Sequence, residues 1–188
     1  MRRHSMLAAA AAAIVAGAFV AAPTIAQTPP FGQEEDTSYA AKVWEAMVAQ
    51  GVAGVEGDNV IRSFPYEGAE PHGFVLETLY SNATIDGHTG ALVVKRNYGP
   101  EGVDVDTVQS NPAEHLGAVT VMFKREAGYD DENANWFWAK YLPDGTLDKN
   151  PAGLELAGRI AKGNEEAGCI ACHTGAGEDM LFTTDGIN

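Results

Sequence analysis

Two stretches, Gly117-Ala118-Val119-Thr120-Val121-Met122-Phe123-Lys124 and Asn135-Trp136-Phe137-Trp138-Ala139-Lys140-Tyr141-Leu142, decide the fold class. Both are rich in the β-branched and aromatic residues that favour strands, as are segments 73–80 and 90–98. Turn-forming residues separate the segments, namely Asp86-Gly87, Gly99-Pro100, residues 128–133 and Pro143-Asp144-Gly145. Because no helix-length periodic segment lies between the strands, we predict a mainly β (α+β) domain built on an antiparallel sheet.

Two helices are expected to flank this sheet. Thr37 or Ser38 can cap a helix that Gly51 ends, and its apolar residues recur at helical spacing: Ala40, Val43, Trp44, Met47 and Val48. A second, short helix is expected around residues 153–163, just before a cysteine-containing motif near the C-terminus. The apolar stripe of the first helix would pack against the sheet, and the second helix would lead into the motif.

The first 26 residues have the pattern of a secretory signal peptide. Arg2 and Arg3 precede an apolar run from Met6 to Val20, and Thr24-Ile25-Ala26 offers a small-residue cleavage site. A membrane anchor is the alternative, but the run is shorter than the ~20 residues that span a bilayer. We therefore predict cleavage near Ala26, a single domain over residues 27–188, a periplasmic location and no membrane association after cleavage. The net charge of −14 disfavours nucleic acid as a partner.

The two cysteines lie in the motif Cys169-Ile170-Ala171-Cys172-His173. A disulfide would be the usual expectation in an exported protein, but this spacing is typical of c-type haem attachment. A redox disulfide would favour a βαβ context, and a zinc site would need a second cysteine pair; neither is present. The motif predicts one haem c bound through Cys169 and Cys172, with His173 as the axial iron ligand.

The opposite face of the iron separates two classes of function. A six-coordinate electron-transfer cytochrome needs a second strong axial ligand, and the candidates are Met47, Met122, Met180, His72, His88 and His115. Met180 is only seven residues beyond His173, which suits packing beside the proximal loop. His72 is interpreted as structural, a hydrogen-bonded imidazole in a turn, and His88 and His115 lie in polar turns. Without such a ligand, the iron stays open to small molecules.

The order of several segments resembles the cytochrome P-460 family, which also contains the cytochromes c'-beta. The similarity covers roughly residues 38–183. The matching segments are the helix with Trp44, His72-Gly73, Asn82-Ala83, Ala91-Leu92-Val93-Val94-Lys95, residues 119–124, Gly128-Tyr129-Asp130, residues 135–141, residues 168–173 and Asp179-Met180-Leu181-Phe182-Thr183. Unlike common small c-type cytochromes, which are mostly helical with an early haem motif, this chain has its motif after a sheet.

This resemblance implies a mainly antiparallel β domain, usually dimeric, with a haem that is five-coordinate at rest. The family's open distal side binds small nitrogen species. Cytochrome P-460 oxidises hydroxylamine and carries a bond from a lysine nitrogen to the porphyrin, whereas cytochromes c'-beta bind nitric oxide with no known turnover. A soluble cytochrome would accept electrons if the protein is an enzyme.

Lys95 falls where the family places its cross-linking lysine. On a strand, Ala91, Val93, Lys95 and Asn97 share one face, so Lys95 can reach a haem if that face looks inward. The alternative is a solvated lysine, with Leu92 and Val94 pointing inward instead.

Thr120 is expected on the distal side, four residues before Lys124. The hydroxylamine oxidisers have a carboxylate at this point, and a threonine can donate a hydrogen bond but cannot act as a carboxylate base. Glu114 and Glu126 are possible substitutes, although charged loop residues are usually solvated. Phe74, Phe123, Phe137 and Trp138 could cover the iron or could form ordinary core.

Overall fold

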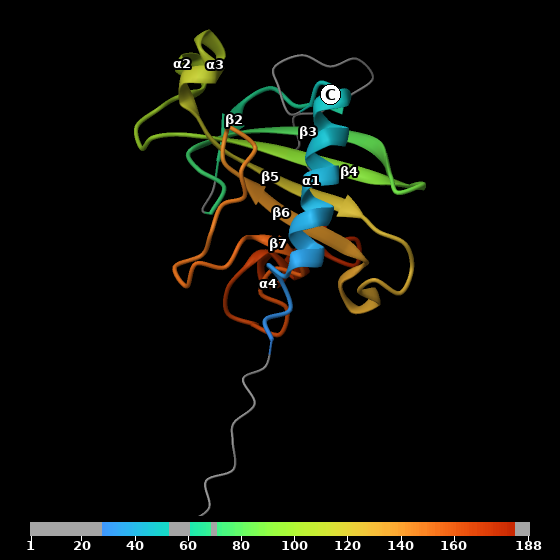
Figure 1. Cartoon of the computed structure of the whole chain (residues 1–188). Coiled ribbons are helices and arrows are strands. Elements are labelled where there is room, and N and C mark those ends of the chain that lie inside the picture. The colour runs from blue at the N-terminus through green and yellow to red at the C-terminus, as the bar shows by residue number, and fades with distance from the viewer. Residues whose placement is uncertain (1–27, 53–60, 69–70, 183–188) are drawn as a thin grey trace, which may run out of the picture.

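The computed structural model describes residues 28–52, 61–68 and 71–182, so the predicted signal peptide lies outside the described residues. An antiparallel sheet of seven strands forms the body of the fold, in the order β1-β3-β4-β5-β6-β7, with β2 also paired to β3 (Figure 1). The mainly β prediction is therefore confirmed. The strands are β1 (Ile61–Arg62), β2 (Tyr66–Glu67), β3 (Val75–Ile85), β4 (His88–Tyr98), β5 (Leu116–Lys124), β6 (Trp136–Tyr141) and β7 (Ala157–Gly158).

The long hairpin between β3 and β4 sets the register of the sheet. Asp86 and Gly87 connect the strands and both have positive φ, 49° and 82°, as a two-residue type I′ turn requires. All residues of β3 pair with β4 without a bulge, from Val75↔Tyr98 to Ile85↔His88. Because side chains alternate along a strand, this register fixes which residues of β4 share each face.

Both faces of the sheet are covered. On one face, Leu79, Leu92, Val94, Val119 and other apolar residues form the main core with helix α1 (Glu34–Ala49). Figure 1 shows α1 lying across the strands. The opposite face carries Val93, Met122, Trp136 and Trp138, which pack against the C-terminal segment. The N-terminal helix is thus found as expected, although it begins at Glu34, where Gln33 and not Thr37 or Ser38 forms the capping box.

The helix expected around residues 153–163 is wrong. This segment forms turns and the short strand β7, which pairs with Trp138 and Ala139 of β6. Gly153, Gly158 and Gly163 have φ values of 81°, 101° and 81°, which a right-handed helix excludes. The short C-terminal helix is instead α4 (Cys169–His173), which contains the cysteine motif and lies after β7 (Figure 1).

The remaining short elements lie in connections between strands: α2 (Val105–Ser110), α3 (Pro112–His115), η1 (Asp131–Asn133) and η2 (Thr174–Ala176). In the described part of the chain, no helix has both the length and the apolar character needed to cross a membrane.

Candidate functional site: a cavity between the sheet and the C-terminal segment

A cavity of about 200 Å³ lies between one face of the sheet and the C-terminal segment. Strand β4 contributes Val93 and Lys95, and the chain after β7 contributes Ile160 and the cysteine motif. The residues expected to hold or modify a haem, together with Thr120, all line this cavity: Lys95, Thr120, Cys169, Cys172 and His173. The fold therefore brings together residues that are up to 78 positions apart in the chain (from 95 to 173).

Helix α4 places the two thiols and the imidazole on one side of a single helical turn. Cys169 and Cys172 are three residues apart, and Cys169 and His173 are four apart, which are the spacings of neighbours on a helix surface. Both cysteines are free thiols, so the structure contains no disulfide between them. Gly168, with φ 111°, begins the helix, and a Cβ there would meet the Cβ of Ala161 at 2.3 Å. Glycine at this position thus allows the motif to pack against the preceding turn.

His173 is buried, and a hydrogen bond and two aromatic contacts fix the orientation of its ring. Its Nδ1 lies 2.8 Å from the carbonyl oxygen of Met180, so a neutral imidazole carries its proton on Nδ1 and keeps the lone pair on Nε2. The ring of Trp138 meets it edge to face at 4.8 Å between centroids, and Phe182 packs at 5.2 Å. Burial lowers the pKa of His173, which favours the neutral form that binds a metal ion. Met180 packs beside His173, as its sequence position predicts.

Lys95 is buried on the cavity face of β4, with 8% of its surface exposed. It pairs across the sheet with Thr78 on β3 and Thr120 on β5. The side chains of the adjacent residues, Val94 and Arg96, lie on the opposite face, which α1 covers. The structure gives the Nζ of Lys95 no hydrogen-bond or ion-pair partner among the described residues. Burial lowers the pKa of Lys95, so a larger fraction of this lysine is the neutral amine than of a solvated one.

Thr120 belongs to a short polar chain at the cavity wall. Its Oγ1 lies 3.1 Å from His72 Nδ1 and accepts from Asn97 Nδ2 at 3.4 Å. His72 also lines the cavity, and its ring lies 6.1 Å from that of His173. Burial lowers the pKa of His72 to about 4, and the positive charge of Lys95 acts in the same direction. The expected hydrogen bond of His72 is present, but its position in the cavity was missed because a turn histidine gives no periodic signal.

Trp138, which the sequence offered as a possible cover for the iron, and Met122, a candidate axial ligand, also line the cavity. Trp138 is buried, and its Nε1–H has no hydrogen-bond partner among the described residues. Phe123 and Phe137 belong to the core on the helix side of the sheet, and Phe74 is 42% exposed at the surface. None of these three rings lines the cavity. The alternation of Trp138 and Lys140 on β6 could have indicated that Trp138 shares a face with Thr120.

The other candidate axial ligands lie elsewhere. Met47 is in the core beneath α1, and His88 is bonded to the carbonyl oxygen of Lys124 at the hairpin end of the sheet. His115 ends α3, and neither histidine lines the cavity. Glu114 and Glu126, the possible carboxylate substitutes, are exposed and also lie outside it. Of the six candidates, His72 and Met122 are the ones whose side chains share the cavity with His173.

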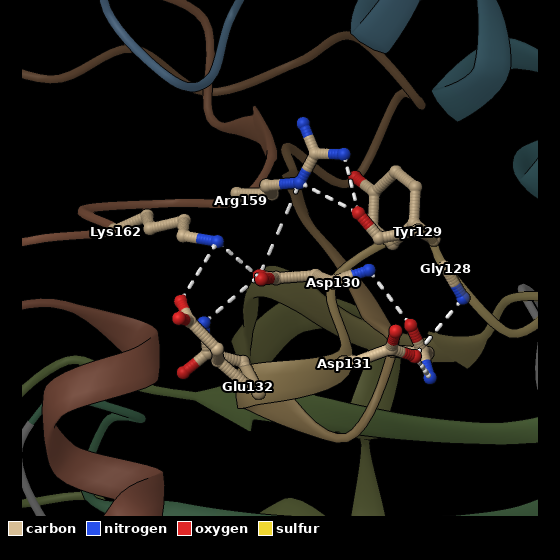
Figure 2. A network of polar contacts seen from close by, with 9 residues as sticks. Gly128, Tyr129, Asp130, Asp131, Glu132, Arg159 and Lys162 are labelled. Atoms are coloured by element: carbon tan, nitrogen blue, oxygen red, sulfur yellow. Dashed lines mark hydrogen bonds and ion pairs between the residues drawn. The ribbon is translucent and has the colours of Figure 1, made fainter.

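A polar network fixes the segment that leads to the cysteine motif. The Asp130 side chain is fully buried and forms ion pairs with Lys162 and, at 4.0 Å, with Arg159 (Figure 2). Arg159 also donates to the carbonyl oxygen of Tyr129 and stacks over the Tyr129 ring. The loop after β5 is thereby tied to residues 159–162, which six residues separate from the start of the motif at Cys169.

These side chains fit a haem. The cavity combines two free thiols for thioether bonds, one imidazole with an available Nε2, and apolar walls from Val93, Met122 and Trp138. The partnerless Nε1–H of Trp138 adds a buried donor with unused hydrogen-bonding capacity. This donor set matches what c-type attachment requires of a protein.

Comparison with known proteins agrees with this geometry. The family model described as Cytochrome P460 matches residues 76–183, which is more than half of the chain and includes β3 to β6 and the cysteine motif. Searches of curated proteins and of solved structures found no match.

Proposed function

Because the chain belongs to the cytochrome P460 family and is therefore a haem protein of that type, we propose that it binds one covalent c-type haem and uses it to oxidise hydroxylamine. The observation that carries this proposal is Lys95, a largely buried lysine whose Nζ has no partner among the described residues and which lines the same cavity as Thr120, Cys169, Cys172 and His173. When bound, the haem supplies an iron centre that coordinates the substrate nitrogen and accepts electrons.

The motif residues would hold the haem. Cys169 and Cys172 form the thioether bonds, and His173 gives its Nε2 lone pair to the iron. The hydrogen bond from His173 Nδ1–H to the Met180 carbonyl fixes the ring and increases the basicity of Nε2. Trp138 and Phe182 restrict rotation of the imidazole by packing against it.

Lys95 would modify the haem. Only the neutral amine is nucleophilic, and burial, which outweighs the opposing effect of Cys172 and Cys169 on the pKa of Lys95, favours that form. Its position on the cavity face allows Nζ to form the nitrogen–carbon bond to the porphyrin that the family resemblance implies. Forming this bond would break one N–H bond of the amine and one C–H bond of the porphyrin and release two protons and two electrons, so maturation would require a two-electron oxidant such as a peroxide.

Turnover would require that the substrate loses both electrons and protons. The electrons pass to a soluble electron-accepting cytochrome, and the protons pass to water. Water can reach the site because Cys172 and half-buried Lys140, which line the cavity, are in contact with solvent. Apolar lining residues keep the remainder of the site dry, which strengthens polar contacts to the substrate.

A second function, nitric oxide binding without turnover, is favoured by a different observation. None of the described residues that line the cavity is an aspartate or a glutamate. Thr120 cannot replace a carboxylate as a proton acceptor at neutral pH. A binder needs only the coordinated iron and its pocket.

The physiological setting is part of the same proposal. Residues 1–26 would direct the chain to the periplasm, where cysteines are available for haem attachment, and the mature domain would work as a homodimer. The strongly acidic surface, with a net charge of −14 for the whole chain, suits an electron-accepting partner with a basic surface.

The first experiment is the absorption spectrum of the ferrous protein after expression with a c-haem maturation system. A strongly red-shifted, broad Soret band that is lost in Lys95→Arg would support the lysine bond, and hydroxylamine-dependent reduction of an acceptor would then establish turnover. An ordinary high-spin c-type spectrum would favour nitric oxide binding. Sharp low-spin bands would contradict both functions and indicate an electron carrier.

A further inference from the structure

The polar chain Asn97–Thr120–His72 ends at His72 Nδ1, whose protonation follows from the orientation of the Asn97 amide. Asn97 Nδ2 can only donate, so Thr120 Oγ1 uses a lone pair to accept from it. The hydroxyl retains one proton of its own. Among the described residues the other partner of Oγ1 is His72 Nδ1, at 3.1 Å. Thr120 Oγ1 and His72 Nδ1 are both satisfied when Thr120 donates to Nδ1, and Asn97 Oδ1 is then the atom left without a hydrogen-bond partner among the described residues.

This arrangement places the imidazole proton of His72 on Nε2. A neutral imidazole has one N–H, and Nδ1 is occupied as an acceptor. In the imidazolium form both nitrogens carry protons, so Nε2 is a donor in either charge state. A protonated Nε2 has no lone pair for a metal ion, which disfavours His72 as a sixth iron ligand.

We propose that His72 is a hydrogen-bond donor to the small molecule bound at the haem iron, and that Thr120 and Asn97 are positioning residues that set its tautomer. This inference rests on the proposed binding of small nitrogen species and adds a residue to that site. His72 and His173 line the same cavity with their rings 6.1 Å apart, so the donor lies close to the iron ligand. The donor favours ligands with an accepting atom next to the coordinating one, as in hydroxylamine and nitric oxide.

The test uses carbon monoxide on the ferrous holoprotein, because its infrared stretch reports hydrogen bonding independently of any turnover. A donor to the carbon monoxide oxygen increases electron donation from iron into the ligand and weakens the C–O bond. We expect the C–O band of the wild type at lower wavenumber than that of His72→Phe. His72→Gln, which retains an N–H donor, should restore part of the shift.

Two variants at Thr120, one without and one with a hydroxyl, test its positioning role. In Thr120→Val the Nδ1 partner is lost, both His72 tautomers become populated, and the C–O band should move toward that of His72→Phe. Thr120→Ser keeps the hydroxyl and should retain the wild-type band.

Three results would overturn the inference. Equal C–O bands in the wild type and His72→Phe would remove the donor role, and an unchanged band in Thr120→Val would remove the positioning role. Low-spin bands that disappear in His72→Phe would show that Nε2 binds iron, which corresponds to the reverse orientation of the Asn97 amide. A shifted band in a protein that does not act on hydroxylamine would keep this inference while rejecting the proposed turnover.

Discussion

Lys95 occupies a face of β4 where its neighbours across the sheet, Thr78 and Thr120, offer its Nζ no hydrogen bond, so its largely buried side chain lowers stability. Burial without a hydrogen-bond partner destabilises a polar group by about 1–3 kcal/mol in proteins. Lysine at this position lowers the stability of the fold, whereas its amine can act as a nucleophile. This combination supports a functional role for Lys95.

The first prediction concerns the stability that Lys95 costs the fold. Lys95→Met should increase the free energy of unfolding of the haem-free chain by about 1–3 kcal/mol at pH 7. Because burial lowers the pKa of Lys95, the unfolded chain binds more protons between the folded pKa and the usual lysine value. The wild type should therefore gain stability as pH rises from 7 to 10, just below the usual lysine pKa, and the stability difference from Lys95→Met should narrow.

Urea denaturation at both pH values measures this effect. Lys149→Met is the matched control, because the Lys149 side chain is 57% exposed and its ion pair with Glu155 spans 3.7 Å. The control should change stability by less than about 0.5 kcal/mol at either pH. A Lys95→Met variant that is less stable than the wild type would contradict the prediction.

Single residues differed in how far the sequence could place them. Strand alternation correctly grouped Val93, Lys95 and Asn97 on one face, but it could not show which face was buried, since both are. The position of Thr120 followed from the family resemblance, which places a distal residue four positions before Lys124, and the structure has Thr120 in the cavity wall. His72 lies in a turn, where no periodicity relates a residue to the sheet, so only the folded chain shows that it reaches the cavity.

Among the elements, the loop after β5 is held to the segment before the cysteine motif by Asp130 (Figure 2). Asp130→Asn should destabilise the protein by about 1–3 kcal/mol, because a buried charge pair is broken while its partners retain partial solvent contact. The side chains of Lys162 and Arg159 are 33% and 34% exposed, which reduces the effect below that of a fully buried pair. Hydrogen exchange should increase over residues 157–164.

Glu132→Gln is the control for Asp130→Asn, since Glu132 also pairs with Lys162, at 3.5 Å, but its side chain is 84% exposed. Removing this surface pair should cost less than about 0.5 kcal/mol and leave the exchange of residues 157–164 unchanged. If both variants had equal effects in thermal unfolding and exchange, burial of Asp130 would not be what holds the segment.

The elements also show where sequence patterns fail. The turn between β3 and β4 could be predicted from the sequence because Asp-Gly permits two consecutive positive φ angles. Residues 153–163 contain an apolar spacing that suits a helix, but their three glycines have positive φ and Ala157–Gly158 pair with β6. Tertiary pairing thus overrides local periodicity in this segment.

For the whole molecule, the sheet separates a stabilising face from a functional face. On the helix side, the Glu77 carboxylate is fully buried and accepts hydrogen bonds from Arg96 at 3.0 Å and from the Tyr98 hydroxyl at 2.9 Å. Arg96 also donates to the carbonyl oxygen of Val52, just after α1. Lys95 and Thr120 lie on the other face, and none of the hydrogen bonds described here connects the two groups.

This separation gives the last prediction. Glu77→Gln should lower the free energy of unfolding by about 3 kcal/mol, because Arg96 is left buried without its counter-charge. The absorption spectrum of the ferrous holoprotein should stay that of the wild type, since the cavity is on the opposite face. Urea denaturation of the haem-free chain should also show that Glu77→Gln and Lys95→Met combine additively, within about 0.5 kcal/mol, as expected for groups without shared partners.

Lys95→Met is the counterpart that should change the spectrum while increasing the stability of the haem-free chain. A Glu77→Gln variant with an altered Soret band, or a double variant with a clear departure from additivity, would show that strain crosses the sheet. In that case the Glu77 network would help to shape the cavity. With additive energies and an unchanged band, the helix-covered face supplies stability, and the cavity face can keep a buried lysine because that stability exceeds its cost.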